Sequence, residues 1–249
     1  MIQVEDRDGV TILGMADGKA NAMSLEFCQQ LTESFLKLDH SGTSAIVITG
    51  SGRIFSAGVD LLRLLDGGAP YIRKFLPALT AMLTTVFSYP KPVVAAVNGH
   101  AIAGGCVLAC AADRRLMARE PGRIGVTELL VGVPFPAAAM EIMRCAVSPR
   151  YFEDVIFGGA TYAPEEAIER GLISEIIAPE ALISRAIACA RALADLSPTA
   201  FALTKRQART LEFERIRRDA DCDEVERIWT APETLARIRD YVARTLRKS

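Results

Sequence analysis

The chain has few of the residues on which metal-dependent and redox enzymes depend. Only two of its 249 residues are histidines, His40 and His100. We therefore expect no histidine-rich metal site, and a serine or cysteine hydrolase would need one of these two as its base. The six cysteines form no C-x-x-C pair, which disfavours zinc ribbons and thioredoxin-like motifs. We expect reduced thiols packed as small apolar side chains.

The chain also lacks an excess of charge of either sign. It has 29 lysines and arginines against 30 aspartates and glutamates, a net charge of −1. Without a broad positive field, nucleic acid is not expected as the main partner. With 50% hydrophobic and 24% charged residues, the composition is typical of a folded globular protein. No basic-then-apolar leader precedes the first strand-like stretch, so we expect a cytoplasmic location.

One uncharged stretch, residues 92–112, is long enough to span a bilayer. It is interrupted by Asn98-Gly99-His100 and by Gly104-Gly105. We predict a buried strand over residues 92–97, a turn, and a buried helix beginning near Cys106, and therefore no membrane span.

The hydrophobic pattern of the first half predicts a mixed α/β fold. Strand-like stretches alternate with helical apolar stripes, which favours a largely parallel sheet. A short helical turn after Asp60 is expected to break at Gly67-Gly68-Ala69-Pro70. The strands are expected at residues 2–5, 10–15, 45–49, 92–97 and 115–118, and the helices at residues 25–38 and 71–87.

From Ala137 onward the pattern becomes almost wholly helical. Five prolines are each expected to open a helical stretch, because proline is tolerated in a first turn; they are Pro149, Pro164, Pro179, Pro198 and Pro232. We predict an α/β core over residues 1–197 and a helical region over residues 198–249. The two form one functional unit, and the helices pack either on their own subunit or on a neighbour.

Two glycine-containing turns between a strand and a helix stand out, at residues 55–60 and 98–106. Loops typical of Rossmann, P-loop and α/β-hydrolase proteins are missing from the sequence. Small residues in such turns leave backbone N–H groups uncovered, and two adjacent turns can offer two donors to one oxygen, as in an oxyanion hole. The alternative is that the glycines only allow tight packing or positive φ.

The sequence is identified as a member of the crotonase superfamily, the enoyl-CoA hydratase/isomerase family, by five segments in family order. The subgroup that it resembles most is the Δ3,Δ2-enoyl-CoA isomerases, through residues 21–27, 103–106 and 218–221. The five family segments are residues 55–60, 98–106, 124–134, 163–173 and 202–205.

This resemblance implies a crotonase-like spiral of ββα units with a helical C-terminal trimerisation region. It implies that the Val59 and Gly104 amides bind the thioester oxygen and that Glu128 is a catalytic carboxylate. Coenzyme A is part of the acyl-CoA substrate, and no metal or further cofactor is implied. A homotrimer or hexamer is expected. The residues implied to bind the substrate are Ser56, Ala57, Gly58, Val59, Asp60 and Gly104.

The sequence departs from the family pattern at three places. Val107 stands where hydratases usually place a second glutamate, and Pro134-Phe135-Pro136 replaces a glycine-rich stretch. A basic residue often found after the first turn would fall at Leu62, with Arg63 beside it as a substitute.

The residues around Glu128 also favour a catalytic role, because Glu128 is the only charged residue between Arg123 and Glu141. Apolar surroundings raise the pKa of a carboxyl group and make it a better base. The alternative is an exposed strand-end residue or a structural ion pair. We expect structural roles for His100, Asp113, Arg114 and Arg115.

The predicted activity is a shift of the double bond of 3-enoyl-CoA to 2-enoyl-CoA, a step of fatty acid metabolism, through a thioester enolate. A 2-enoyl-CoA hydratase and a non-catalytic acyl-CoA-binding homologue are the alternatives. Because hydration divides its proton transfers over two glutamates, the single carboxylate favours the isomerase.

Overall fold

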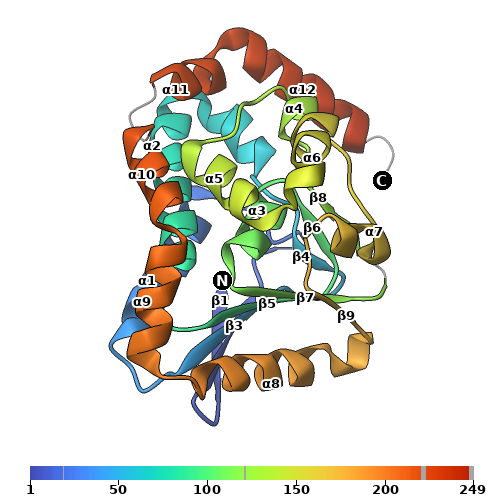
Figure 1. Ribbon diagram of the computed structural model, residues 1–249. Helices are drawn as coiled ribbons and strands as arrows, with labels where there is room; N and C mark the ends of the chain where they lie inside the picture. Colours follow the sequence, from blue (N-terminus) through green and yellow to red (C-terminus); the bar gives the residue numbers. More distant parts are fainter. Residues whose placement is uncertain (19, 121, 220–222, 247–249) are drawn as a thin grey trace.

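The computed structural model describes residues 1–18, 20–120, 122–219 and 223–246 (Figure 1). A main sheet has the strand order β1-β2-β3-β5-β7-β9. Only β1 is antiparallel to its neighbour, and the remaining pairs are parallel. The strands are β1 (Ile2–Arg7), β2 (Val10–Met15), β3 (Ala45–Thr49), β5 (Val93–Val97), β7 (Arg114–Ala118) and β9 (Glu175–Ile177).

A second, smaller sheet stands beside the first and contains β4 (Ile54–Ser56), β6 (His100–Ile102) and β8 (Ile124–Gly125), all parallel. Each of its strands directly follows a strand of the main sheet and precedes a helix. The chain thus repeats a ββα unit three times, ending in α2 (Leu61–Ser88), α3 (Gly104–Ala111) and α4 (Glu128–Val131). The predicted spiral of ββα units is confirmed.

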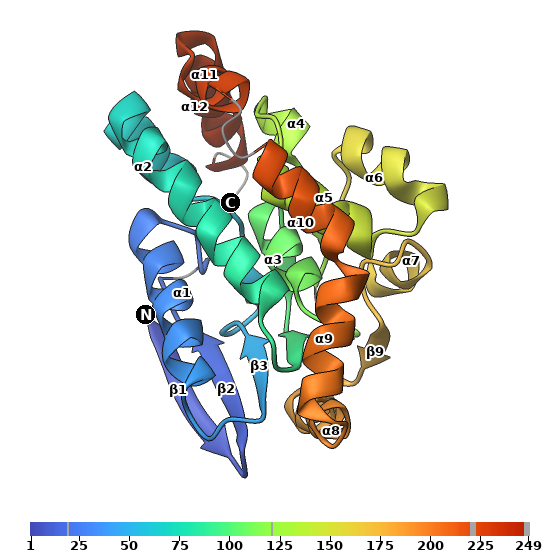
Figure 2. The ribbon, with the colours of Figure 1, turned by 60° about the vertical axis from the view of Figure 1, so that its left-hand side comes forward.

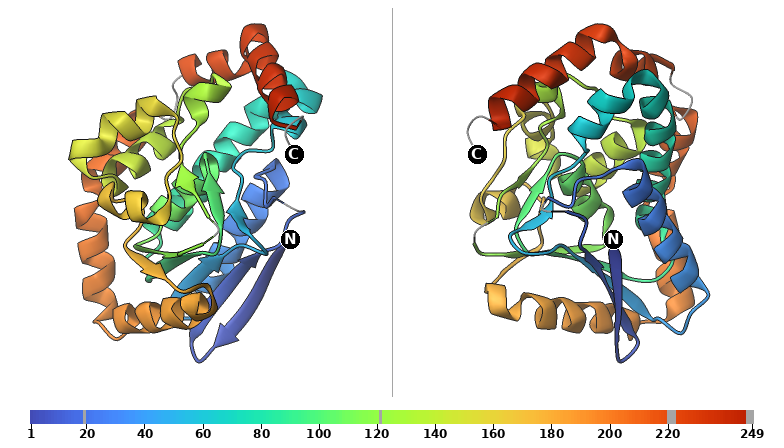
Figure 3. Two further views of the ribbon diagram at one scale, coloured as in Figure 1. Left: turned by 90° about the vertical axis from the view of Figure 1, so that its right-hand side faces the viewer. Right: turned by 180° about the vertical axis from the view of Figure 1, so that it is seen from behind.

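Both faces of the main sheet are covered, which explains why its central strands are apolar runs. In β3, Ala45 and Val47 face a cluster around α8 (Leu182–Ala194), while Ile46 and Ile48 face the larger core with α1 (Leu25–Asp39), α2 and α3. Figure 3 shows α8 below the sheet and α2 above it. α1 begins where the sequence predicts, since the Ser24 side chain accepts a hydrogen bond from the Phe27 N–H at 3.1 Å.

The helix after Asp60 is interrupted where the sequence predicts. Within α2 the backbone of Gly68, with φ 56° and ψ −154°, is not helical, so two helical segments meet there at a kink. Both segments contribute buried side chains to one core: Leu64 before the kink and Ile72, Phe75 and Leu79 after it.

The uncharged stretch at residues 92–112 forms β5, β6 and α3, as predicted, with β6 added in the turn. Among the described residues no single helix is long and apolar enough to cross a membrane. Only the pair Pro179–Ala194 and Pro198–Ala208, bent by 98°, meets the length and composition criteria together.

The region after Ala137 is helical, and each of the five prolines opens a helix or a 3₁₀ turn, as predicted. The exception is β9, a three-residue strand that pairs with β7 and that the sequence analysis missed. The two 3₁₀ turns are Pro149–Tyr151 and Pro179–Ala181; the helices besides α8 are α5 (Ala137–Ala146), α6 (Phe152–Gly158), α7 (Pro164–Glu169), α9 (Pro198–Ala208), α10 (Thr210–Arg218), α11 (Asp223–Thr230) and α12 (Pro232–Leu246).

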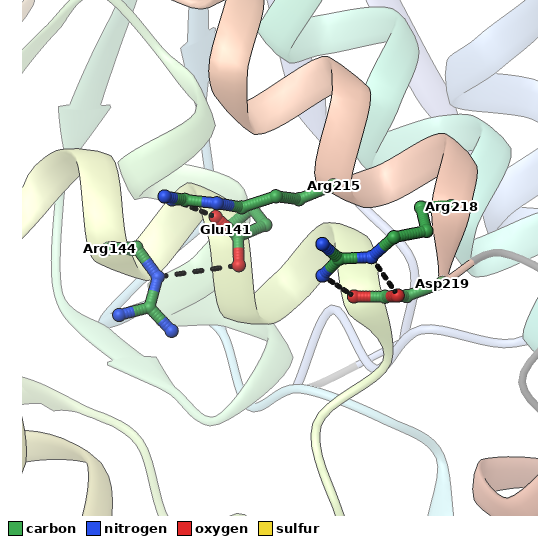
Figure 4. Close-up of polar contacts among 5 residues, drawn as sticks. All are labelled: Glu141, Arg144, Arg215, Arg218 and Asp219. Carbon is green, nitrogen blue, oxygen red and sulfur yellow. Dashed lines mark hydrogen bonds and ion pairs between the residues drawn. The ribbon is translucent and has the colours of Figure 1, made fainter.

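Three of the C-terminal helices, α10, α11 and α12, pack on their own chain, while packing on a neighbouring copy stays a prediction. α10 contacts α5, α11 and α12 contact α2, and α12 also contacts α4 (Figure 2). One polar link is Glu141 of α5, whose buried carboxylate accepts from Arg215 of α10 at 3.1 Å and from Arg144 at 3.3 Å (Figure 4). Beside it, Arg218 pairs with Asp219. Ala220, Asp221 and Cys222, which the sequence analysis used, lie outside the described residues.

The expectation that the cysteines are packed as apolar side chains holds in part. Cys28, Cys106 and Cys110 are buried, but Cys189 is half-buried and Cys145 is exposed. All five are free thiols.

Candidate active site

The first glycine-containing turn connects β4 to α2 and presents one free backbone donor. The Met23 N–H donates to the Gly58 carbonyl at 2.8 Å, and the Met23 carbonyl accepts from the Asp60 N–H at 3.1 Å. These bonds hold the residues on either side of Val59. The Val59 N–H itself has no hydrogen-bond partner in the described part of the chain.

The second turn connects β6 to α3 and presents another free backbone donor. Gly104 is the first residue of α3, and its N–H also has no partner among the described residues. Ala103 before it has φ 51° and ψ −124°, a conformation that costs an L-residue roughly 1–3 kcal/mol. A hydrogen bond from the Ala103 N–H to the Gly125 carbonyl at 2.8 Å ties this turn to β8. Strain of this kind is typical of functional sites.

The two turns touch each other at Gly58. A Cβ on Gly58 would lie 3.0 Å from the Gly104 nitrogen and 2.7 Å from the Ile102 carbonyl oxygen. Gly58 also has a φ of +84°, so glycine is required both by its conformation and by the lack of space. The free N–H groups of Val59 and Gly104 therefore lie beside one another, at the positive end of the α3 dipole.

Glu128 lies in the same pocket as the first residue of α4, and it is only 8% exposed. Its Oε2 atom is buried and has no hydrogen-bond partner in the described residues. Burial raises the pKa of this carboxyl group from 4.5 to about 7, against a smaller opposing effect of the Glu128 and Thr127 backbone N–H groups. Near neutral pH the group is therefore suited both to accept and to donate a proton.

A cavity of about 80 Å³ joins the two turns and the carboxylate. Among the described residues Glu128 is the only carboxylate in its wall, and Val107, 1% exposed, contributes an apolar side chain to it. The residues that line it are Ala57, Val59, Leu61, Leu79, Leu83, Ile102, Ala103, Gly104, Val107, Thr127, Glu128, Val131, Val133, Pro136, Ala139, Trp229 and Tyr241.

The structure thus brings Ala57, Val59, Gly104 and Glu128 together in the pocket lining. The other predicted substrate-binding residues, Ser56, Gly58 and Asp60, do not line the pocket. The buried Ser56 hydroxyl donates to the Asn21 carbonyl at 2.8 Å and accepts from the Gly58 N–H at 3.2 Å, which shapes the first turn. Asp60 caps α2 by accepting from the Arg63 N–H at 3.0 Å. Contacts of Ser56, Gly58 and Asp60 with coenzyme A stay predictions.

Leu62 and Arg63, the two positions considered for a basic residue after the first turn, are both exposed to solvent. Leu62 is 53% exposed. The Arg63 side chain is 57% exposed and lies 3.6 Å from Glu26. His100, in β6, does not line the pocket.

The C-terminal helices contribute to this site in a way that the sequence did not predict. Trp229 of α11 and Tyr241 of α12 line the pocket together with Leu79 and Leu83 of α2. Trp229 is the only tryptophan of the chain, and it stands in an amphipathic stretch. That signal predicts burial, but burial in the pocket follows only from the packing of α11 on α2.

Two unpaired backbone donors in the wall of an apolar pocket, beside one carboxylate, are suited to stabilise a negative oxygen and to move a proton next to it. No group of three or more metal-ligating side chains occurs in the described residues. The enoyl-CoA hydratase/isomerase family model matches residues 5–223. The chain belongs to this family and is an enzyme with the crotonase fold.

Known relatives carry the names of both activities of the family. A putative enoyl-CoA hydratase of Thermus thermophilus is 34% identical over 209 residues, which cover 82% of each chain. The solved structure of a probable enoyl-CoA hydratase of Mycobacterium tuberculosis is 34% identical, with a TM-score of 0.85 over 90% of this chain and 95% of that one. Human mitochondrial Δ3,Δ2-enoyl-CoA isomerase is 25% identical, with a TM-score of 0.93 over 100% of this chain and 99% of that one.

Proposed function

We propose that this enzyme is a Δ3,Δ2-enoyl-CoA isomerase, which shifts the double bond of a 3-enoyl-CoA to the 2-position. The observation that carries the proposal is the single buried carboxylate, Glu128, in an otherwise apolar pocket beside two unpaired backbone donors. The similarity to the human isomerase over the full length of the chain supports it further.

The thioester carbonyl accepts hydrogen bonds from the Val59 and Gly104 N–H groups. The ionised Glu128 carboxylate removes a proton from C2, and the electron pair of the broken C–H bond is delocalised onto the carbonyl oxygen as a dienolate. The two amides stabilise this oxygen, because they are fixed before the charge develops. The protonated Glu128 then returns its proton to C4, and the double bond between C2 and C3 forms. Coenzyme A, as part of the substrate, extends along the turn of residues 56–60, and no further cofactor takes part.

The isomerase is favoured over the hydratase by Val107. Addition of water requires an oriented water molecule at C3 and a proton for C2, and hydratases divide this work over two glutamates. Here the side chain at the second position is apolar and buried, so a water molecule has one acceptor fewer. A proton shift from C2 to C4 needs only one carboxylate, since the same group can accept and return the proton.

We expect isomerisation of 3-hexenoyl-CoA to exceed hydration of crotonyl-CoA by at least about tenfold in kcat/KM, which corresponds to ~1.4 kcal/mol in barrier height. Both reactions are measured spectrophotometrically on the purified enzyme. Val107→Glu is expected to raise hydration, and Val107→Leu is the matched apolar control that leaves it unchanged.

Faster hydration of crotonyl-CoA than isomerisation of any 3-enoyl-CoA would replace the isomerase by the hydratase named among the relatives. Binding of acyl-CoA without either reaction would indicate a non-catalytic acyl-CoA-binding homologue.

We also propose that the chain assembles as a homotrimer, alone or paired as a hexamer. Apolar side chains remain exposed on the C-terminal helices, with Leu203 of α9 45% exposed and Leu211 of α10 61% exposed. Light scattering at micromolar concentration is expected to give the mass of a trimer or hexamer, and the mass of a monomer would contradict the proposal.

A further inference from the structure

The apolar part of the pocket is closed by a wall to which α11 contributes one large side chain. Trp229 is 2% exposed, and it is the largest of the fully buried side chains. Its Nε1–H donates to the Pro134 carbonyl at 2.9 Å, so the indole is held both by packing and by a directed hydrogen bond. A ring fixed in this way is a rigid boundary for whatever enters the pocket.

Four other apolar side chains of the pocket wall are buried as well. Leu79 and Leu83 of α2 are 3% and 1% exposed, and Val133 and Ala139 are 3% and 4% exposed. All four line the pocket with Trp229. Because interiors are close-packed, a longer acyl chain has to displace one of these groups to pass.

The size of the cavity sets the length of chain that fits. An apolar cavity of about 150 Å³ holds a ring of six carbons such as benzene. The cavity of about 80 Å³ is roughly half that size, so a short acyl chain fits it better than a long one.

We propose that Trp229 is the specificity-determining residue that restricts this enzyme to short-chain acyl-CoA thioesters. The inference rests on the proposed function for the identity of the pocket, but it concerns binding of the acyl chain and not the transfer of the proton. Trp229 acts by its volume, since its only polar hydrogen is already bonded to Pro134.

The test measures binding of hexanoyl-CoA and decanoyl-CoA by isothermal titration calorimetry. These saturated thioesters do not react, so the result is independent of the activity. The wild-type protein is expected to bind hexanoyl-CoA at least about tenfold more tightly, because a group too large for a closed pocket is rejected by that order of magnitude. In Trp229→Leu the difference is expected to fall below about threefold. Phe35→Leu, a loss of aromatic volume at a fully buried site outside the pocket, is the control that keeps the wild-type preference.

Decanoyl-CoA binding as tightly as hexanoyl-CoA in the wild-type protein would overturn the inference, as would an unchanged preference in a folded Trp229→Leu variant. Should Trp229→Leu fail to fold, Leu83→Ala opens the same wall and carries the same expectation. The expected binding preference together with absent isomerisation of 3-hexenoyl-CoA would refute the proposed function and leave the assignment of Trp229 intact.

Discussion

Glu128→Gln is expected to lower kcat for the isomerisation of 3-hexenoyl-CoA by about two to four orders of magnitude, the usual contribution of a positioned acid–base group. The amide has nearly the shape of the carboxylate but neither accepts nor returns the proton. The Val59 and Gly104 donors are untouched, so the affinity for acyl-CoA is expected to stay within about threefold of wild type, because the substitution removes little volume. Single-turnover kinetics and calorimetric binding measure the two effects separately.

The same substitution is expected to stabilise the fold at alkaline pH. Burial raises the pKa of Glu128 from 4.5 to about 7, so the folded state prefers the protonated form. The contribution of Glu128 to the stability of the wild-type protein is therefore largest below pH 4.5, and it is lost as the pH rises through about 7. One pKa unit corresponds to about 1.4 kcal/mol, so Glu128→Gln is expected to be more stable than wild type by up to about 3 kcal/mol at pH 8.

Urea denaturation at about pH 5 and about pH 8 measures this difference, which is expected to be several times larger at the higher pH. Glu165→Gln is the matched control, because Glu165 is exposed and forms a surface ion pair with Arg119 at 2.8 Å. An inactive Glu128→Gln variant that is less stable than wild type at both pH values would assign the loss of activity to the fold and contradict the catalytic role.

The buried Oε2 of Glu128, which has no hydrogen-bond partner among the described residues, and the strained backbone at Ala103 each lower the stability of the fold, and both lie at the pocket. Where sequence and structure depart from ordinary packing rules at one place, function is the usual reason. The stability must then come from elsewhere in the chain.

The sequence predicts well those parts of the fold that depend on neighbouring residues. The β-branched run of β3, the Ser24 cap and the prolines that open helices act locally, and all of them are found where expected. The apolar sequence around Glu128 likewise predicts its burial.

Other features depend on contacts between distant segments and leave little signal in the sequence. The strand β9 has three residues, and its pairing with β7 rather than its own pattern creates it. Trp229 enters the site only because α11 packs against α2. Asp113 has the structural role that the sequence predicts, but its partners, Lys205 and Arg209, are some 90 residues away in the chain.

Asp113 joins the core to the C-terminal helices. Its Oδ2 accepts from the Val93 N–H at 2.8 Å and from Lys205 Nζ at 2.8 Å, and its Oδ1 accepts from Arg209 at 3.0 Å. The three charged side chains are 11%, 6% and 11% exposed, in the order Asp113, Lys205, Arg209. One carboxylate thus neutralises two buried cations at the junction of β5, α9 and α10.

Asp113→Asn is expected to lower the free energy of unfolding by about 3–5 kcal/mol at pH 7, the cost of breaking a buried ion pair from one side. The amide retains an oxygen for the Val93 N–H, but Lys205 and Arg209 are left as two uncompensated like charges. Asp8→Asn is the matched control, because the Asp8 side chain is 90% exposed and its 2.9 Å pair with Arg191 contributes at most about 1 kcal/mol.

The pH dependence of the destabilisation by Asp113→Asn tests whether it is caused by the lost charge. Burial lowers the pKa of Lys205 from 10.5 to about 8, more than the nearby Asp113 carboxylate raises it. The folded state therefore prefers the neutral amine, and stability decreases as the pH falls through about 8. Without Asp113 the charged amine is less favourable still, so the destabilisation by Asp113→Asn is expected to be largest below pH 8 and smaller at about pH 9.5, where Lys205 is neutral and only Arg209 remains charged. Urea denaturation followed by circular dichroism measures both values, and an equal loss at the two pH values would show that Asp113 acts through its hydrogen bonds and packing rather than through its charge.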